Sequence, residues 1–412
     1  MVFLPSARSV GHDQTSLSAM TQPIDKFSWV HPWTMLIGFG LTLVLLAWAG
    51  RRLSHDGFHD HFVRFHPMIA PDSNYRPTVA EMQGVVRQNA RPDQILVVVA
   101  GNSILQGVGQ PAGAVWSQRL QELLGPKYAV VNLAFRGSSP TTGGTIVAEA
   151  LRDEYPRQIL IANMGATESI DPLGTGDYLF IVYDAYYKGL LLSWAPRDTQ
   201  IKALPQLSES LLNARIDRWF YQNSFWNWWS TQVAFTFPTP MQPELSSAFD
   251  ARGNLRDREN DYDDFPFKTR FAPEFEARNL EIAAARSSDF YPTQTDGQWE
   301  LATEVYERFL TSAGNAIPDA LKSRTLLLLG RDAPYYTHQL SPEIQARDDL
   351  AFSRSVDGLE SIGYASMQYG RDYAPSQYGD RTHLTKSGGA RLAADVAPKV
   401  RALAAKLGYV QP

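Results

Sequence analysis

The hydrophobic pattern of this chain begins with one long apolar segment near the N-terminus. Residues 33–50 contain no charged side chain, Trp33 and Trp48 stand near the two ends, and two arginines follow directly. About 17–25 apolar residues cross a bilayer, and tryptophan favours its two interfaces. The segment predicts an uncleaved transmembrane anchor, because a long tail (residues 1–32) precedes it and no small-residue cleavage site follows. The alternative is a buried core helix.

The charges beside this segment leave its orientation open. Arg51 and Arg52 favour a cytoplasmic position for everything that follows them, and only Arg8 and Lys26 oppose them on the other side. Residues 51–90 are expected to form a juxtamembrane connector. Four histidines in it are a candidate metal site, but their acidic and basic neighbours favour a solvated polar segment. These histidines are His55, His59, His61 and His66.

Beyond the connector, short apolar runs alternate with helix-like stretches. The apolar runs are residues 95–100, 129–133, 158–162 and 325–329. The helix-like stretches are residues 79–88, 116–124, 143–151 and 303–310. Strands that alternate with helices predict a mainly parallel sheet covered on both faces, an α/β protein built as a three-layer α/β/α sandwich. We therefore expect one folded domain over residues 91–410, with functional residues at the carboxyl ends of its strands.

Residues 170–300 interrupt this alternation and are expected to form an insertion on the rim of the sheet. Aromatic residues gather in it, most densely at 219–229, and the polar stretch at 246–264 is expected to be an exposed loop. A helix with aromatic side chains on most sides must be buried or meet something apolar. Three interpretations of 219–229 remain open: a core helix of the insertion, contact with the membrane interface, and stacking on sugar rings.

Composition narrows the classes of function. The 412 residues include 38 basic and 43 acidic side chains, a net charge of −5, and no basic stripe. A nucleic-acid partner is therefore not expected. Cysteine is absent, which excludes disulfides and thiolate metal sites. Hydrophobic residues make up 44%, as expected of a chain that forms a core.

Two short segments, far apart in the sequence, carry the residue types of a serine hydrolase. Ser103 follows an apolar run, and Asp380 and His383 stand three residues apart before a helix-like stretch. A serine hydroxyl needs an imidazole to take its proton and a carboxylate to orient that imidazole. Considered alone, Ser103 is equally consistent with a buried structural serine. Asp380 and His383 alone are equally consistent with the start of a surface helix. Their order along the chain favours the catalytic interpretation.

The segment Gly101-Asn102-Ser103 resembles the first motif of the SGNH hydrolases, also called the GDSL esterase family, and Asp380-x-x-His383 resembles their last motif. Asn102 stands where the family usually has aspartate, and asparagine keeps the capping ability of that position. The resemblance implies that Ser103 is the nucleophile, His383 the general base and Asp380 its orienting partner. It implies no metal and no cofactor.

The resemblance also implies an oxyanion hole made of the Ser103 amide, Gly137 and Asn163. N–H groups of this kind stabilise the charge that develops in acyl transfer. Gly137 follows the second apolar run, where the family has a glycine. Asn163 follows the third run, but its surroundings depart from the family's G-x-N-D motif and lack the aspartate. The resemblance covers residues 93–170 and 320–410.

The N-terminal anchor and the insertion look like those of membrane-tethered members of this family. These include DltD, of teichoic acid D-alanylation, and the AlgJ- and AlgX-like proteins of polysaccharide O-acetylation. The similarity implies a single-pass membrane serine esterase or O-acyltransferase that acts on acyl esters of an extracytoplasmic (periplasmic) glycan or carrier, with an MBOAT-type acyltransferase as partner. Two alternatives stay open: a non-catalytic glycan-binding or scaffold subunit, and a cytoplasm-facing lipid or thioester hydrolase.

Overall fold

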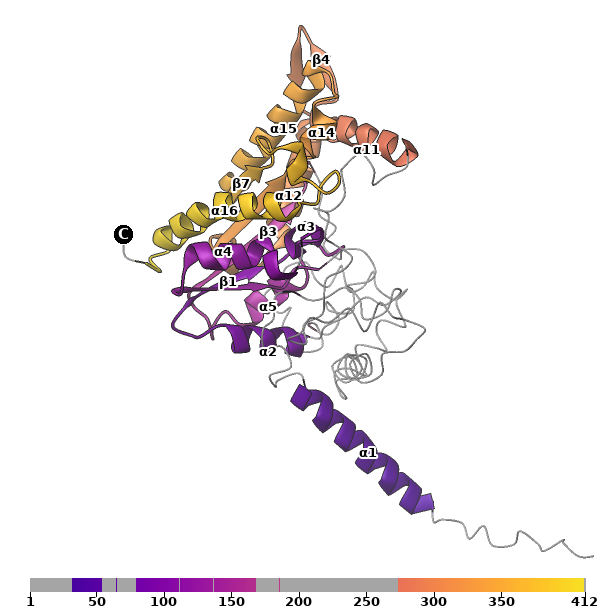
Figure 1. The fold of residues 1–412 in the computed structure, drawn as a ribbon, viewed down its shortest axis with the longest axis vertical. Helices are drawn as coiled ribbons and strands as arrows, with labels where there is room; N and C mark the ends of the chain where they lie inside the picture. The colour runs from indigo at the N-terminus through magenta and orange to yellow at the C-terminus, as the bar shows by residue number, and fades with distance from the viewer. Residues whose placement is uncertain are drawn as a thin grey trace, which may run out of the picture. The chain divides into compact units, whose positions relative to one another are not determined.

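The computed structural model describes residues 32–53, 64, 79–110, 112–135, 137–167, 185 and 273–410 (Figure 1). The chain divides into two compact units, Met1–Leu45 and Leu46–Pro412, which are considered separately. The aromatic run 219–229, the polar stretch 246–264 and the four connector histidines lie outside the described residues.

The predicted apolar segment is a single helix, α1 (Pro32–Leu53). Its 22 residues extend over roughly 33 Å at 1.5 Å per residue, which matches the hydrocarbon thickness of a bilayer. Mean hydropathy reaches 1.8 within it, and only 6% of that window is buried. Large apolar side chains such as Trp33, Leu45 and Trp48 are exposed. By length and composition, α1 is able to cross a membrane.

The folded domain is built on a parallel sheet of five strands, which confirms the α/β class. The strands are β1 (Ile95–Val99), β2 (Tyr128–Asn132), β3 (Gln158–Met164), β6 (Thr325–Gly330) and β7 (Ala365–Tyr369). Their order is β2-β1-β3-β6-β7, with every neighbouring pair parallel. After β1 the chain forms β2 on one side of β1, and it then crosses to form β3 on the other side of β1. In such sheets, ligands bind outside the carboxyl ends of the strands at this reversal.

Alternate side chains along the strands pack into two separate hydrophobic clusters, as expected of strands that are buried on both faces. In β1, Leu96 and Val98 belong to one cluster, while Val97 and Val99 belong to the other. The first cluster takes side chains from α2 (Val79–Asn89), α5 (Gly144–Ala150), α12 (Thr303–Ala316) and α15 (Pro342–Ser361). The second takes them from α4 (Trp116–Leu124), α11 (Pro273–Ala285), α14 (Pro334–Thr337) and α16 (Lys386–Lys406). Figure 1 shows α4 lying beside α16.

Two elements near the predicted boundaries contribute to the core. Helix α2 ends the predicted connector, and its Met82, Val85 and Val86 are fully buried in the first cluster. The last part of the predicted insertion, from residue 273 onward, contains α11 and contributes Ala283 to the second cluster. The remaining described elements are α3 (Ser103–Gln106), η2 (Ala112–Ala114), the hairpin β4 (Thr293–Thr295) and β5 (Gln298–Glu300), α13 (Asp319–Lys322) and η7 (Pro375–Gln377).

Candidate active site

The segment after β1 places Ser103 at the start of the short helix α3. Gly101 joins strand to helix with a φ of 109°, a conformation that residues with a Cβ rarely adopt. A Cβ on Gly101 would also lie 2.2 Å from Oδ1 of Asn163. Asn102 is the N-cap of α3, and its side chain accepts a hydrogen bond from the backbone N–H of Ile104 at 3.0 Å. Asparagine therefore does perform the capping role expected of it at this position.

A second loop, between η7 and α16, carries Asp380 and His383. Oδ1 of Asp380 accepts hydrogen bonds from the backbone N–H groups of Thr382, at 2.8 Å, and of His383, at 2.7 Å. An antiparallel bridge between Tyr378 and Leu384 closes the same loop. These hydrogen bonds stabilise the turn from Asp380 to His383. They therefore also fix the carboxylate of Asp380 relative to the imidazole of His383.

The two segments meet through the imidazole of His383. Its Nδ1 lies 2.6 Å from Oδ2 of Asp380, and its Nε2 lies 2.7 Å from Oγ of Ser103. The side chains of His383 and Asp380 are only 20% and 19% exposed. The structure therefore brings the three predicted residues together in the order hydroxyl, imidazole, carboxylate, which is the order that activates a serine nucleophile.

Electrostatics favour the ionised form of Asp380. Burial works against ionisation, but the hydrogen bond and the attraction of the His383 ring, together with the backbone N–H groups of His383 and Thr382, outweigh it. The pKa of Asp380 is consequently lowered below its ordinary value. An ionised Asp380 pairs with a protonated Nδ1, so that Nε2 of a neutral His383 is the acceptor that faces Ser103. This is the tautomer that is able to remove a proton from the serine.

The two further oxyanion candidates differ in their placement. Asn163 lies within β3, near its carboxyl end, and its Nδ2 donates to Oδ1 of Asn102 at 2.9 Å, while its Oδ1 accepts from the backbone N–H of Asn102 at 3.2 Å. This pairing uses one amide hydrogen of Asn163 and directs the side chain to the Ser103 segment. Gly137 lies in the loop after β2 with a φ of 74°, and it is not among the described residues that line the cavity beside Ser103.

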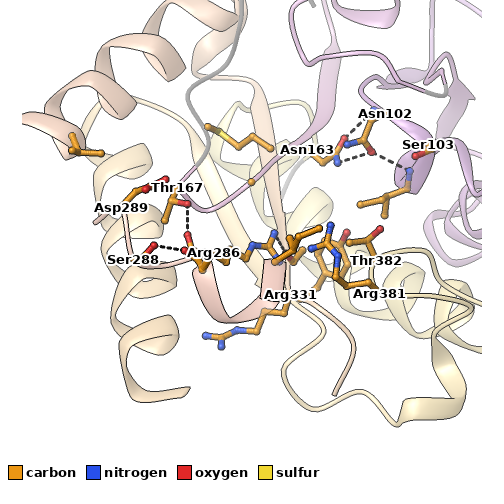
Figure 2. Close-up of a pocket in the computed structure, with 18 of the residues that line it drawn as sticks. Asn102, Ser103, Asn163, Thr167, Arg286, Ser288, Asp289, Arg331, Arg381 and Thr382 are labelled. Carbon is orange, nitrogen blue, oxygen red and sulfur yellow. Dashed lines mark hydrogen bonds between the residues drawn. The ribbon is translucent and has the colours of Figure 1, made fainter. Parts of the chain in front are cut away.

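That cavity has a volume of about 1080 Å³, the size of a small-molecule site. Among the polar residues labelled around it in Figure 2 are those of the serine segment and a set of arginines. The first group is Asn102, Ser103 and Asn163, and the second is Arg286, Arg331 and Arg381. None of these arginines was predicted as a site residue, although the stretch after Gly330, which begins with Arg331, was expected on this rim.

The His383 loop is attached to the loop after β6 through the buried side chain of Asp332. Oδ1 of Asp332 lies 2.7 Å from Nη1 of Arg381 and 2.9 Å from Nη1 of Arg286. The backbone N–H of Ala333 also donates to the carbonyl of Arg381 at 2.8 Å. Because Arg381 stands between Asp380 and His383, these contacts help to fix the imidazole relative to the sheet.

A buried glutamine links the turn after α3 to the same loop. Gln110 is fully buried. Its Nε2 donates to the carbonyl of Leu384 at 3.4 Å, and its Oε1 accepts from the backbone N–H of Trp116 at 2.8 Å. The guanidinium of Arg64 donates to three carbonyl groups of this turn. Buried polar groups bonded in this way help to fix the distance between the Ser103 segment and the His383 loop.

Comparisons of the chain with protein-family models, with curated proteins and with solved structures each found no match. The site is therefore interpreted from its own chemistry. Within the described part of the chain, no group of three or more histidine, aspartate or glutamate side chains is arranged to hold a metal ion.

Proposed function

We propose that this protein is a membrane-anchored serine esterase or O-acyltransferase of the SGNH type, with a three-layer α/β/α catalytic domain. The observation that carries the proposal is the hydrogen-bonded chain from Ser103 through His383 to Asp380, at the carboxyl edge of a parallel sheet and beside a large cavity. Serine, histidine and aspartate in this geometry perform acyl transfer on unrelated folds, so the geometry supports the chemistry without a family match.

In the proposed reaction, Oγ of Ser103 attacks the acyl carbonyl while Nε2 of His383 takes its proton. The new C–O bond converts the carbonyl oxygen to an oxyanion. The proposed donors to this oxyanion are the amides of Ser103 and Gly137 and the side chain of Asn163. The imidazolium, stabilised by Asp380, then returns the proton to the departing alkoxide. Water, or a sugar hydroxyl in the case of transfer, attacks the acyl-serine by the same steps in reverse.

The resemblance and α1 support the proposed substrate and location. We propose an acyl ester of an extracytoplasmic glycan or carrier as substrate, a periplasmic catalytic domain, and an MBOAT-type acyltransferase as partner. Helix α1 supports attachment to a membrane. Arg51 and Arg52 favour the opposite orientation, so a cytoplasm-facing lipid or thioester hydrolase is the competing assignment.

A non-catalytic scaffold is the second candidate function. The departure from the family pattern around Asn163 favours this function. In addition, Asn163, an expected oxyanion donor, already donates a hydrogen bond to Oδ1 of Asn102. A scaffold on a hydrolase fold would retain the cavity for glycan binding and would have no reactive serine.

One labelling experiment separates these assignments. Spheroplasts that carry the full chain are treated with a fluorophosphonate probe that does not cross the cytoplasmic membrane, and a second sample is treated after lysis. We expect labelling in intact spheroplasts, because an activated serine outside the membrane reacts with the probe. Labelling only after lysis would assign the domain to the cytoplasm. No labelling of folded protein in either sample would favour the scaffold.

A further inference from the structure

Arginine side chains gather around the cavity beside Ser103. Among the described residues that line it are four arginines from four separate parts of the fold and one aspartate, Asp289. The arginines are Arg286 directly after α11, Arg308 on α12, Arg331 after β6 and Arg381 in the His383 loop. Guanidinium groups that converge on one cavity present donors for an anion.

Two of these arginines share one counter-ion. Arg286 and Arg381 both lie against Oδ1 of Asp332, and Asp332 is almost fully buried while the two guanidinium groups are 18% and 24% exposed. Among the described residues, Oδ2 of Asp332 has no hydrogen-bond partner. The two guanidinium groups are therefore more exposed than the carboxylate that they share, and Asp332 alone offsets one of their two positive charges.

The other two arginines differ from each other. Arg331 contacts Asp348 at 3.3 Å and Asp349 at 2.7 Å and lies over the ring of Phe352, so its charge is compensated within the protein. Arg308 is exposed, and within the described part of the chain it makes no hydrogen bond or ion pair. Beside the compensated Arg331, the guanidinium groups that line the cavity and keep some exposure are those of Arg286, Arg308 and Arg381.

We propose that this cavity binds an anionic group of the substrate, a carboxylate or a phosphate, through Arg286 and Arg381, with Arg308 as a further contact. The proposal rests on the proposed function and specifies its substrate class: an acyl ester whose alcohol portion carries negative charge. Planar guanidinium groups bind carboxylate and phosphate oxygens through paired N–H donors. An anion here would accept hydrogen bonds from these guanidinium groups and orient the ester toward Ser103.

Matched esters test the proposal on the full chain in detergent. The three substrates are the acetate esters of para-hydroxyphenylpropionate, of its uncharged amide, and of para-hydroxybenzylphosphonate. We expect kcat/KM for at least one anionic ester to exceed that of the amide by about tenfold, the scale of one charge-assisted hydrogen bond, and the preference to weaken at high salt. The carboxylate and phosphonate substrates report which anion fits.

The arginine variants connect this preference to the site. In Arg286→Gln and in Arg308→Gln, we expect the ratio of anionic to amide kcat/KM to fall by about fivefold. Arg381 is not substituted, because it holds the His383 loop. Arg91→Gln is the matched control, since Arg91 is exposed and precedes β1 at the opposite edge of the sheet. Equal kcat/KM for charged and uncharged esters, or a preference unchanged in both variants, would overturn the proposal.

The anion site is also separable from the esterase assignment. If the wild-type chain hydrolyses none of the three esters, the proposed function fails, and para-hydroxybenzylphosphonate and para-hydroxyphenylpropionate are then titrated into the folded protein by calorimetry. Saturable binding of either that is lost in Arg286→Gln would still support an anion site. Absence of saturable binding of both would reject it.

Discussion

Replacing Ser103 by alanine is expected to lower kcat for acyl-ester turnover at least about ten-thousand-fold, because it removes the atom that forms the acyl-enzyme bond. The change deletes one hydroxyl whose described hydrogen bond runs to Nε2 of His383. The helix start is retained, since the N-cap contact comes from Asn102. The loss is measured on the purified full chain as the rate at which a fluorescent or coloured alcohol is released from its ester.

A matched serine separates chemistry from folding in this experiment. Ser353 is exposed on α15, so Ser353→Ala removes the same atom at a position outside the cavity. Its kcat should equal that of the wild type, and both variants should unfold at the wild-type temperature. Turnover by Ser103→Ala within tenfold of the wild type would assign the activity to another group.

Replacing Asp380 by asparagine is expected to lower kcat by about ten-thousand-fold while leaving the loop folded. The Oδ1 atom of asparagine is still able to accept from the backbone N–H groups of Thr382 and His383. Its amide nitrogen, however, would face Nδ1 of His383 and favour the tautomer that has its proton on Nε2. That proton would point at Ser103, so the imidazole would no longer act as a base. An unaltered kcat in Asp380→Asn would remove Asp380 from the mechanism.

The same variant has a pH signature in stability. The pKa of Asp380 is lower in the folded state than in the unfolded chain, so the folded state favours the carboxylate. The stability that this provides is present above the unfolded value of about 3.9 and is lost as pH falls through the folded value. In urea unfolding, the free energy of unfolding of the wild type should therefore exceed that of Asp380→Asn most at about pH 7. This difference in free energy should shrink below about pH 4. A difference that is constant across this range would show that ionisation of Asp380 does not stabilise the fold.

Four of the five strands were predictable because each is a continuous apolar run, as buried parallel strands require. Strand β7 escaped prediction, since it lies at the edge of the sheet and its sequence includes the polar Ser366 and Gln368. Helix α2 was predicted as a helix, but its mixed composition does not reveal that Val85 and Val86 are buried.

The site was predictable only as far as chemistry dictates residue type. Ser103, Asp380 and His383 could be singled out because each reaction role requires a particular group. The cavity arginines could not, since an arginine on a helix or in a loop is ordinarily a solvated charge, and the convergence of Arg286 with Arg381 on Asp332 depends on the tertiary fold.

Identification of the residue that carries the acyl group tests the proposed mechanism most directly. The full chain is mixed with an excess of an activated acetyl ester, quenched in acid during turnover, digested and analysed by mass spectrometry. We expect one acyl group per chain on the peptide that contains Ser103, and none in Ser103→Ala. Steady turnover with Ser103 unmodified, or with the acyl group on another residue, would contradict covalent catalysis by this serine.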